Sequence, residues 1–182
     1  MKELSLNILD ICENSTKAGA TLVEITITEN TDNLEIVIKD DGVGMTHEVL
    51  QSVTNPFYTT RTTRRVGMGI PLFKLSAEQT GGHLKIESRH IDEFPASHGT
   101  QVSARFIKTH MDFTPLGDIV STVKTLIQGH PNIDFIFMHK KDEKRVFLDT
   151  REIRAVLESV PLDSFEVLCW IGENLLEQYN GN

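Results

Sequence analysis

Cysteine is scarce in this 182-residue chain, which contains only Cys12 and Cys169. The two residues lie far apart in the sequence and lack the spacing of metal ligands. We therefore expect neither a disulfide framework nor a cysteine-based metal site. The same scarcity favours a reducing compartment, so we expect the protein to be cytoplasmic.

Long hydrophobic runs and an excess of positive charge are also lacking. The longest apolar runs are far too short to span a membrane, and the N-terminus opens an amphipathic pattern instead of a signal peptide. The formal net charge of -8 argues against a generic binder of nucleic acid or of anionic membranes. With 39% hydrophobic and 24% charged residues, the chain can still bury a core, so we expect one domain, or one domain with a small appendage.

Hydrophobic periodicity predicts helices that alternate with pairs of strands. Helical spacing extends from Leu4 to about Lys17 and from Ile70 to about Thr80, where Pro71 falls in the tolerated first turn. Period-two alternation predicts four strands, of which the first two pair as a hairpin: 22–29, 34–40, 83–88 and 101–107. This order indicates an α/β two-layer sandwich, with a mixed β-sheet and helices on one face.

Two stretches differ in texture from these elements. Residues 41–66 are rich in glycine and threonine, and we expect a long functional loop there with one short helix at about 47–53. Residues 109–116 contain Pro115 and resemble a linker. We therefore divide the chain into residues 1–109 and a small α/β extension at 110–182. The extension is predicted to hold a helix at 116–128, a strand hairpin at 134–139 and 145–149, and helices at 150–159 and 164–179.

The segment Asp40-Asp41-Gly42-Val43-Gly44-Met45 directly follows the second predicted strand. A carboxylate at this point can accept a hydrogen bond from the exocyclic amine of adenine, whereas guanine would present a carbonyl oxygen and be rejected. The glycines at 42 and 44 let the backbone approach a ring closely. Alone, the same residues also supply an ordinary tight turn after a strand.

The segment Gly67-Met68-Gly69-Ile70 opens the second predicted helix. Free amides at a helix N-terminus, with glycines that give close access, form an anion site. Arg61, Arg64 and Arg65 precede it, and guanidinium groups suit bidentate contact with phosphate. The alternative is a helix start with flexible glycines beside ordinary surface arginines.

Asp10 and Asn14 lie four residues apart in the first predicted helix and hence on one helical face. The amide oxygen of Asn14 can ligate Mg²⁺, a hard cation that proteins hold with one or two oxygens plus phosphates and water. Asp10 could orient or deprotonate an attacking water. The alternative is a solvated polar stripe on an amphipathic helix.

These three segments, followed by Gly99-Thr100, resemble in order the ATPase superfamily of gyrase, the 90-kilodalton heat-shock chaperone, histidine kinases and MutL. The resemblance covers roughly residues 4–108 and implies the Bergerat ATP-binding fold. It assigns Mg²⁺ ligation to Asn14 and the general base to Asp10, where hydrolysing members usually carry the longer Glu. The implied ATP-binding residues are Asn14, Asp40, Gly42, Gly44, Met45, Thr60, Arg61, Arg65, Gly67, Met68, Gly69, Ile70 and Thr100.

Within the superfamily, the segments at 55–61 and 81–88 are similar to histidine kinases, whereas Glu13-Asn14-Ser15 is similar to MutL. A histidine kinase carries its phosphorylated histidine on a helical hairpin before the ATP domain. The predicted domain starts here at residue 4, so we expect no autophosphorylation within this chain.

The resemblance thus implies a Mg-ATP-binding protein that acts as a stand-alone kinase or ATPase on a partner protein. From its position, and because it carries no chemical motif, we expect the segment at 110–182 to be the docking element. The main alternative is a non-catalytic subunit that senses adenine nucleotides, and a weaker one is a MutL-like ATPase. We expect no nucleic acid and no membrane as partner, and a homodimer is left open.

Overall fold

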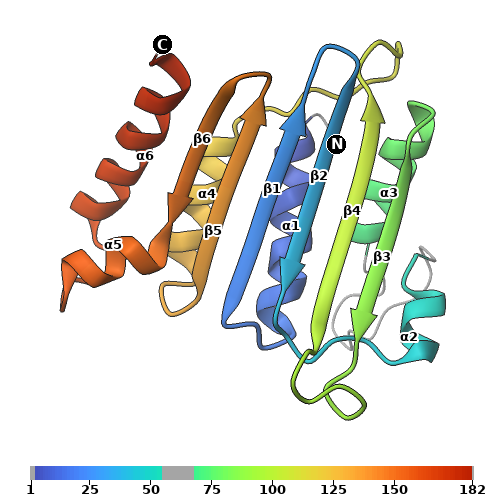
Figure 1. Cartoon of the computed structure of the whole chain (residues 1–182), viewed down its shortest axis with the longest axis horizontal. Coiled ribbons are helices and arrows are strands. Elements are labelled where there is room, and N and C mark those ends of the chain that lie inside the picture. Colours follow the sequence, from blue (N-terminus) through green and yellow to red (C-terminus); the bar gives the residue numbers. More distant parts are fainter. Residues whose placement is uncertain (1–2, 55–67, 182) are drawn as a thin grey trace.

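The computed structural model describes residues 3–54 and 68–181 of the chain. Six strands form one mixed sheet in the order β3-β4-β2-β1-β5-β6 (Figure 1). Every neighbouring pair is antiparallel except β1 and β5, which run parallel. The strands are β1 Leu22–Glu29, β2 Asn33–Asp40, β3 His83–Arg89, β4 Gly99–Ile107, β5 Asp134–Lys141 and β6 Lys144–Asp149.

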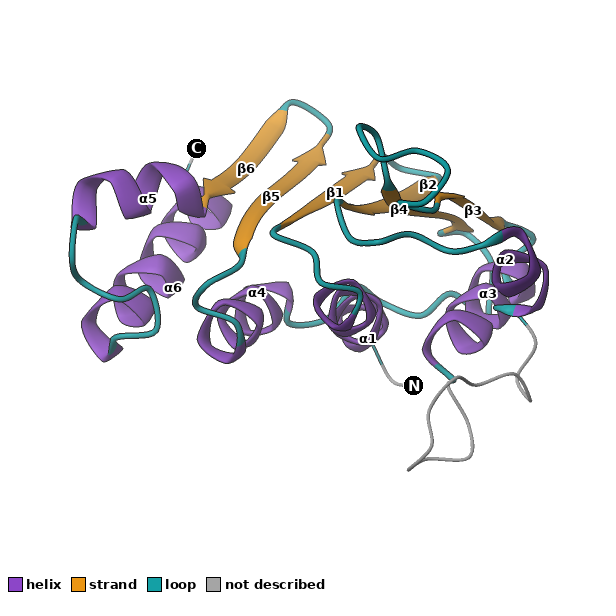
Figure 2. Ribbon diagram, turned by 90° about the horizontal axis from the view of Figure 1, so that it is seen from below, coloured by secondary structure: helices purple, strands orange, loops and turns teal. Residues whose placement is uncertain are grey.

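Six helices are present in the described part of the chain. They are α1 Leu4–Lys17, α2 His47–Ser52, α3 Gly69–Gln79, α4 Ile119–Gly129, α5 Thr150–Leu157 and α6 Phe165–Asn180. Figure 2 shows α1, α3 and α4 side by side under one face of the sheet. The predicted α/β sandwich with a mixed sheet and helices on one face is therefore confirmed. None of the helices in the described residues is both long enough and apolar enough to cross a membrane.

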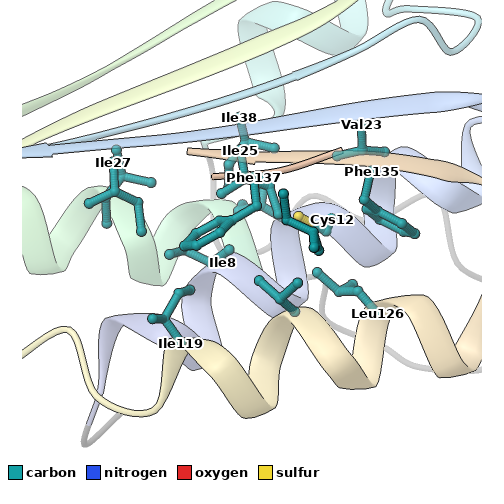
Figure 3. Packing of buried hydrophobic residues seen from close by; sticks show 14 of the residues in the cluster. Ile8, Cys12, Val23, Ile25, Ile27, Ile38, Ile119, Leu126, Phe135 and Phe137 are labelled. Carbon is teal, nitrogen blue, oxygen red and sulfur yellow. The ribbon is translucent and has the colours of Figure 1, made fainter. Parts of the chain in front are cut away.

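One hydrophobic core fills the space between the sheet and these helices. Figure 3 shows side chains from α1, α4, β1, β2 and β5 meeting there, among them Ile8, Cys12, Ile25, Ile38, Leu126, Phe135 and Phe137. Burial raises the pKa of the Cys12 thiol far above its ordinary value, and the nearby carboxylate of Asp40 adds to the shift. Cys12 is therefore held as an unreactive thiol, and both cysteines are free, as the sequence predicted.

The C-terminal segment joins this same sheet. The predicted hairpin of β5 and β6 is present, and β5 pairs with β1 along its length, from Leu22 with Asp134 to Glu29 with Lys141. Since α4 and β5 also supply core side chains, the layers are continuous across residue 109. The division into two domains stays a prediction about organisation.

The start of α4 differs from the prediction by three residues. The helix begins at Ile119 and not at Leu116, because Gly117 has a φ of +79° and the side chain of Asp118 caps the helix. The Asp118 carboxylate accepts a hydrogen bond from the Ser121 amide at 2.9 Å. An aspartate three residues before a serine, after a glycine, is an N-terminal signal that the apolar periodicity obscured.

Candidate functional site

The carboxylate of Asp40, at the end of β2, is only 9% exposed and is held from three sides. Its Oδ2 accepts a hydrogen bond from Ser15 Oγ of α1 at 2.6 Å. Its Oδ1 accepts two more, from the amides of Gly42 at 3.0 Å and Thr100 at 3.2 Å. A carboxylate offers roughly four acceptor positions. These bonds leave about one, on Oδ2, for an additional N–H donor.

The register of β2 and β4 explains why Thr100 reaches Asp40. The two residues are paired across the strands, and Gly99 immediately before has a φ of +132°. A Cβ at Gly99 would overlap the carbonyl oxygen of Asp40. Only glycine therefore allows β4 to begin this close to β2, which accounts physically for the Gly99-Thr100 pair.

The loop at residues 41–45 is packed between the end of α1 and the end of β3. The amide of Val43 donates to the carbonyl of Ala18 at 2.9 Å, and the Val43 carbonyl accepts from the Ile91 amide at 2.8 Å. Gly44 has a φ of +71°, and a Cβ there would overlap the carbonyl oxygen of Arg89. Only glycine at position 44 therefore permits this conformation of the loop.

Two polar side chains that sequence reasoning missed complete this packing. Ser88 Oγ accepts from the Met45 amide at 2.7 Å and lies 2.8 Å from Thr100 Oγ1. His98 Nδ1 lies 2.6 Å from the carbonyl oxygen of Gly42. Because a carbonyl oxygen can only accept, Nδ1 must carry the proton. Nothing in the sequence pattern pointed to His98, since its partner is 56 residues away.

The Asp41 carboxylate binds the start of β1, unlike that of its neighbour Asp40. Its Oδ1 accepts hydrogen bonds from the backbone amides of Thr21 at 2.7 Å and Leu22 at 2.9 Å. Partial burial raises the pKa of the Asp41 carboxyl, but these bonds and one from the Thr21 hydroxyl outweigh it and hold the pKa below its ordinary value. Asp41 therefore fixes the entry to β1, and it shares none of the hydrogen-bond donors of Asp40.

The N-terminus of α3 lies beside the Asp10–Asn14 face of α1. A Cβ built on Gly69 would lie 3.2 Å from Asp10 Cβ and 3.8 Å from Asn14 Nδ2. Met68, the N-cap residue, makes no side-chain capping bond within the described residues. Amides and helix dipole at this terminus favour an anion. The fold thus brings together the first and third motifs, which are more than fifty residues apart.

Glu13, the other carboxylate of α1, pairs with His130 and Lys17 and does not lie at the start of α3 as Asp10 does. His130 Nε2 lies 2.7 Å from Glu13 Oε1, and Lys17 Nζ lies 3.6 Å from Oε2. Burial raises the pKa of Glu13, but the hydrogen bond and charge of His130, together with Lys17, hold it below its ordinary value. Asp10, which is exposed, is hence the carboxylate of α1 beside the start of α3.

The residues present fit a magnesium ion carried by a phosphate ligand. No group of three His, Cys, Asp or Glu side chains suited to a metal occurs within residues 3–54 and 68–181. A metal held by the protein alone is therefore not indicated there. The Asn14 amide beside the opening of α3 matches the pattern of Mg²⁺, which uses few protein oxygens and completes its shell with phosphate and water.

Two more of the predicted site residues lie within the described part of the chain. Met68 is 42% exposed at the start of α3, and Ile70 is 8% exposed and anchors that start in the core. Thr60, Arg61, Arg65 and Gly67 lie outside the described residues, as do Arg64 and the stretch at 55–61.

The fold and the placement of these four motifs define an α/β sandwich of the gyrase, heat-shock chaperone, histidine kinase and MutL type. The chain belongs to the family of histidine kinase-, DNA gyrase B-, and HSP90-like ATPases, whose family model matches residues 1–110.

Two known relatives are similar to part of this chain. Sporulation kinase C of Bacillus subtilis (strain 168) is 33% identical over 89 residues, or 48% of this chain and 20% of the kinase. Sensor protein SrrB of Staphylococcus aureus (strain NCTC 8325 / PS 47) is 34% identical over 93 residues, or 48% of this chain and 16% of the sensor. The chain thus matches a fifth or less of these relatives' length.

The structure of the Aquifex aeolicus MutL ATPase domain complexed with ADP is similar in fold, with a TM-score of 0.58 at 16% identity. The match covers 87% of this chain and 70% of that one. The family model matches only residues 1–110, whereas the structural match covers 87% of the 182 residues. The likeness in fold therefore continues into the C-terminal segment.

The contact between His98 and Gly42 leads to a first prediction. Replacing His98 with alanine removes a hydrogen bond worth about 0.5–1.5 kcal/mol, so exchange of the Met45 and Ile91 amides should accelerate roughly 2- to 10-fold. Asparagine at 98 can place an N–H near the Nδ1 position and should restore most of the protection. Native-state hydrogen exchange measures this. Equal exchange rates in wild type and the alanine variant would contradict the contact.

Proposed function

We propose that the protein binds Mg-ATP between α1, β2 and α3 and acts as a stand-alone kinase or ATPase on a partner protein in the cytoplasm. The observation that carries the proposal is the Asp40 carboxylate. It is buried and fixed by Ser15, Gly42 and Thr100, with one acceptor position left over. Such a group recognises the exocyclic amine of adenine and rejects the carbonyl of guanine.

The other end of the nucleotide is assigned to the start of α3. Its amides and helix dipole would receive the phosphates, and the predicted contacts of Thr60, Arg61, Arg65, Gly67 and Met68 would add to them. Asn14 would hold the Mg²⁺, which screens phosphate charge when bound. The closeness of Gly69 to Asp10 and Asn14 supports this arrangement.

Asp10 is the candidate for positioning or deprotonating a nucleophile. It lies beside Gly69, while Glu13 is occupied by His130. An aspartate is one methylene shorter than the glutamate usual in hydrolysing members, so slow hydrolysis is expected. In transfer to a partner, the acceptor brings its own nucleophile, and the need for a base is smaller.

The names of the aligned relatives, a sporulation kinase and a sensor protein, support a role in phosphotransfer over one in DNA repair. The acidic net charge points the same way. The alternative is a regulatory subunit that binds adenine nucleotide without converting it, which the shorter base at Asp10 would suit.

The deciding experiment uses γ-labelled ATP with Mg²⁺ and separates label released as phosphate from label kept on protein. Release that an Asp40→Asn variant lacks identifies an ATPase. Transfer to an added partner, without release, identifies a kinase. ATP that stays bound and intact, with every candidate partner tested, identifies the nucleotide sensor and rejects the catalytic proposal.

Asn14 gives a second prediction. Replacing Asn14 with alanine should leave the affinity for ATP in EDTA nearly unchanged and should abolish the gain in affinity on adding Mg²⁺, because the metal loses its protein oxygen. Calorimetric titrations with and without Mg²⁺ test this. If Mg²⁺ still increases the affinity of the variant, the metal assignment is wrong.

A further inference from the structure

The segment from α5 to the end of α6 gathers exposed apolar side chains at one end of the molecule. Among the described residues, five of the eleven exposed large hydrophobic side chains fall in this stretch. They are Val156 at 82% exposure, Val160 at 46%, Phe165 at 77%, Trp170 at 50% and Leu176 at 50%. Figures 1 and 2 show α6 beyond β6, at the opposite end of the sheet from α2 and α3.

The exposed side chains of α6 form an ordered surface. Its inner side packs on α4 and β6 through Val167, Leu168, Ile171, Gly172 and Leu175. On the outer side, Phe165, Cys169 and Leu176 are spaced by four and seven residues and so form one apolar stripe.

A row of negative charge runs beside the apolar stripe. Glu166, Glu173 and Glu177 have the same helical spacing, and all three are exposed. Trp170 lies on the far side of this row. We call the stripe, the three glutamates and Trp170 the α6 outer face.

Negative charge predominates from residue 155 onward, although Arg151 and Arg154 lie earlier in α5 and Lys124 Nζ of α4 lies beside Gly172 of α6. Residues 155–182 contain five acidic side chains and no Lys, Arg or His. A second copy of the chain would present the same negative row across a symmetric contact, which like charges oppose. Anionic lipid and nucleic acid are opposed for the same reason. A positively charged polypeptide is the complement that remains.

We propose that the α6 outer face binds a basic amphipathic helix of a partner protein. The apolar side of that helix packs on Phe165 and Leu176, and its Lys or Arg side chains meet the glutamate row. α6 has 16 residues and is about 24 Å long, enough for a partner helix of several turns. This deepens the proposed function, because it names the kind of partner on which the ATP-binding site acts.

The test uses the full chain and a tryptophan-free peptide of about 18 residues, in which leucine repeats at helical spacing and lysine fills the other positions. Trp170 is the one tryptophan of the sequence, so its fluorescence reports binding directly. We expect saturable binding that weakens as salt is added. A peptide with glutamate in place of lysine should not bind.

One variant replaces apolar side chains of the stripe, and a second neutralises the glutamate row. A Phe165→Ser, Leu176→Ser double variant and a Glu166→Gln, Glu173→Gln, Glu177→Gln triple variant should each weaken peptide binding about tenfold or more. Met111→Ser, at a side chain 93% exposed, and a Glu35→Gln, Glu93→Gln, Glu143→Gln triple are the matched controls. Thermal unfolding checks that all variants are folded.

The outcomes separate the alternatives. Control variants that weaken binding as much as the α6 variants would show general charge attraction and overturn the proposal. A concentration-dependent dimer of the protein alone, lost in the Phe165→Ser, Leu176→Ser variant, would identify a second copy as the occupant and also overturn it. The titration needs no nucleotide, and ATP binding is measured separately, so failure of the ATP proposal leaves this result readable.

Discussion

Replacing Asp40 with asparagine should both weaken ATP binding and change the preferred base. The remaining oxygen can keep the bonds from Gly42 and Thr100, but an amide NH₂ then stands where Oδ2 faced the ligand. Against the adenine amine this sets donor against donor, at a cost of about 1–3 kcal/mol, or roughly 5- to 150-fold in Kd. Inosine triphosphate carries a carbonyl at the same ring position and should bind the variant relatively better than ATP does.

Calorimetric titration of both variant and wild type with ATP and inosine triphosphate measures this switch. Asp41→Asn is the matched control, since Asp41 bonds Thr21 and Leu22 and should leave the ATP preference unaltered. The fold should tolerate the Asp40→Asn substitution, because the hydroxyl of Ser15 can turn from donor to acceptor. An Asp40→Asn variant that still prefers ATP as strongly as wild type would remove Asp40 from base recognition.

Replacing Gly44 with alanine should displace the loop at 41–45 and abolish measurable ATP binding. The new Cβ would overlap the Arg89 carbonyl oxygen, and alanine also disfavours a φ of +71°. The positive φ alone costs about 1–2 kcal/mol. The overlap adds to this and breaks the Val43–Ile91 and Met45–Ser88 hydrogen bonds.

Gly81→Ala is the matched control, because it has the conformational cost of a positive φ without a steric overlap. Gly81 has a φ of +79°, and a Cβ there would meet nothing within 4 Å. Its variant should lose only about 1–2 kcal/mol, a fall in Tm of roughly 2–8 °C for a chain of this size. Its ATP affinity should be unchanged. If the two variants unfold at the same temperature and bind ATP equally, the loop does not depend on the close approach of Gly44 to β3.

The sequence was sufficient for the elements and their layers, because each follows from local periodicity. The hairpin of β1 and β2 and the helix from Leu4 to Lys17 were predicted nearly to the residue. The parallel pairing of β1 with β5 was not predicted. More than one hundred residues separate the two strands, and alternation along a strand indicates which face is buried but not which strand lies beside it.

The same distinction between local pattern and long-range contact applies to the site. The motifs at Asp10, Asn14, Asp40 and Gly69 could be recognised in the sequence. The fold places Gly69 beside Asp10 and Asn14 and joins Asp40 to α1 through Ser15. The side chains that fix them were not visible. Ser15 could have been found, because a hydroxyl on the apolar face of α1 needs a buried partner. Ser88 and His98 could not, since their contacts exist only after β3 and β4 meet the loop at 41–45.

The strand and helix beside β1 and β6 cover peptide groups that would otherwise lie at an open sheet edge. A strand at the border of a sheet exposes unpaired peptide groups that invite pairing with another chain. β5 covers β1, whose inward side chains are Val23, Ile25 and Ile27, and α6 then covers β6. There the Gln178 side chain bonds both the amide and the carbonyl of Phe147, at 2.8 and 3.0 Å, as a neighbouring strand would. A fragment cut to the family match alone would uncover β1 and be prone to aggregate.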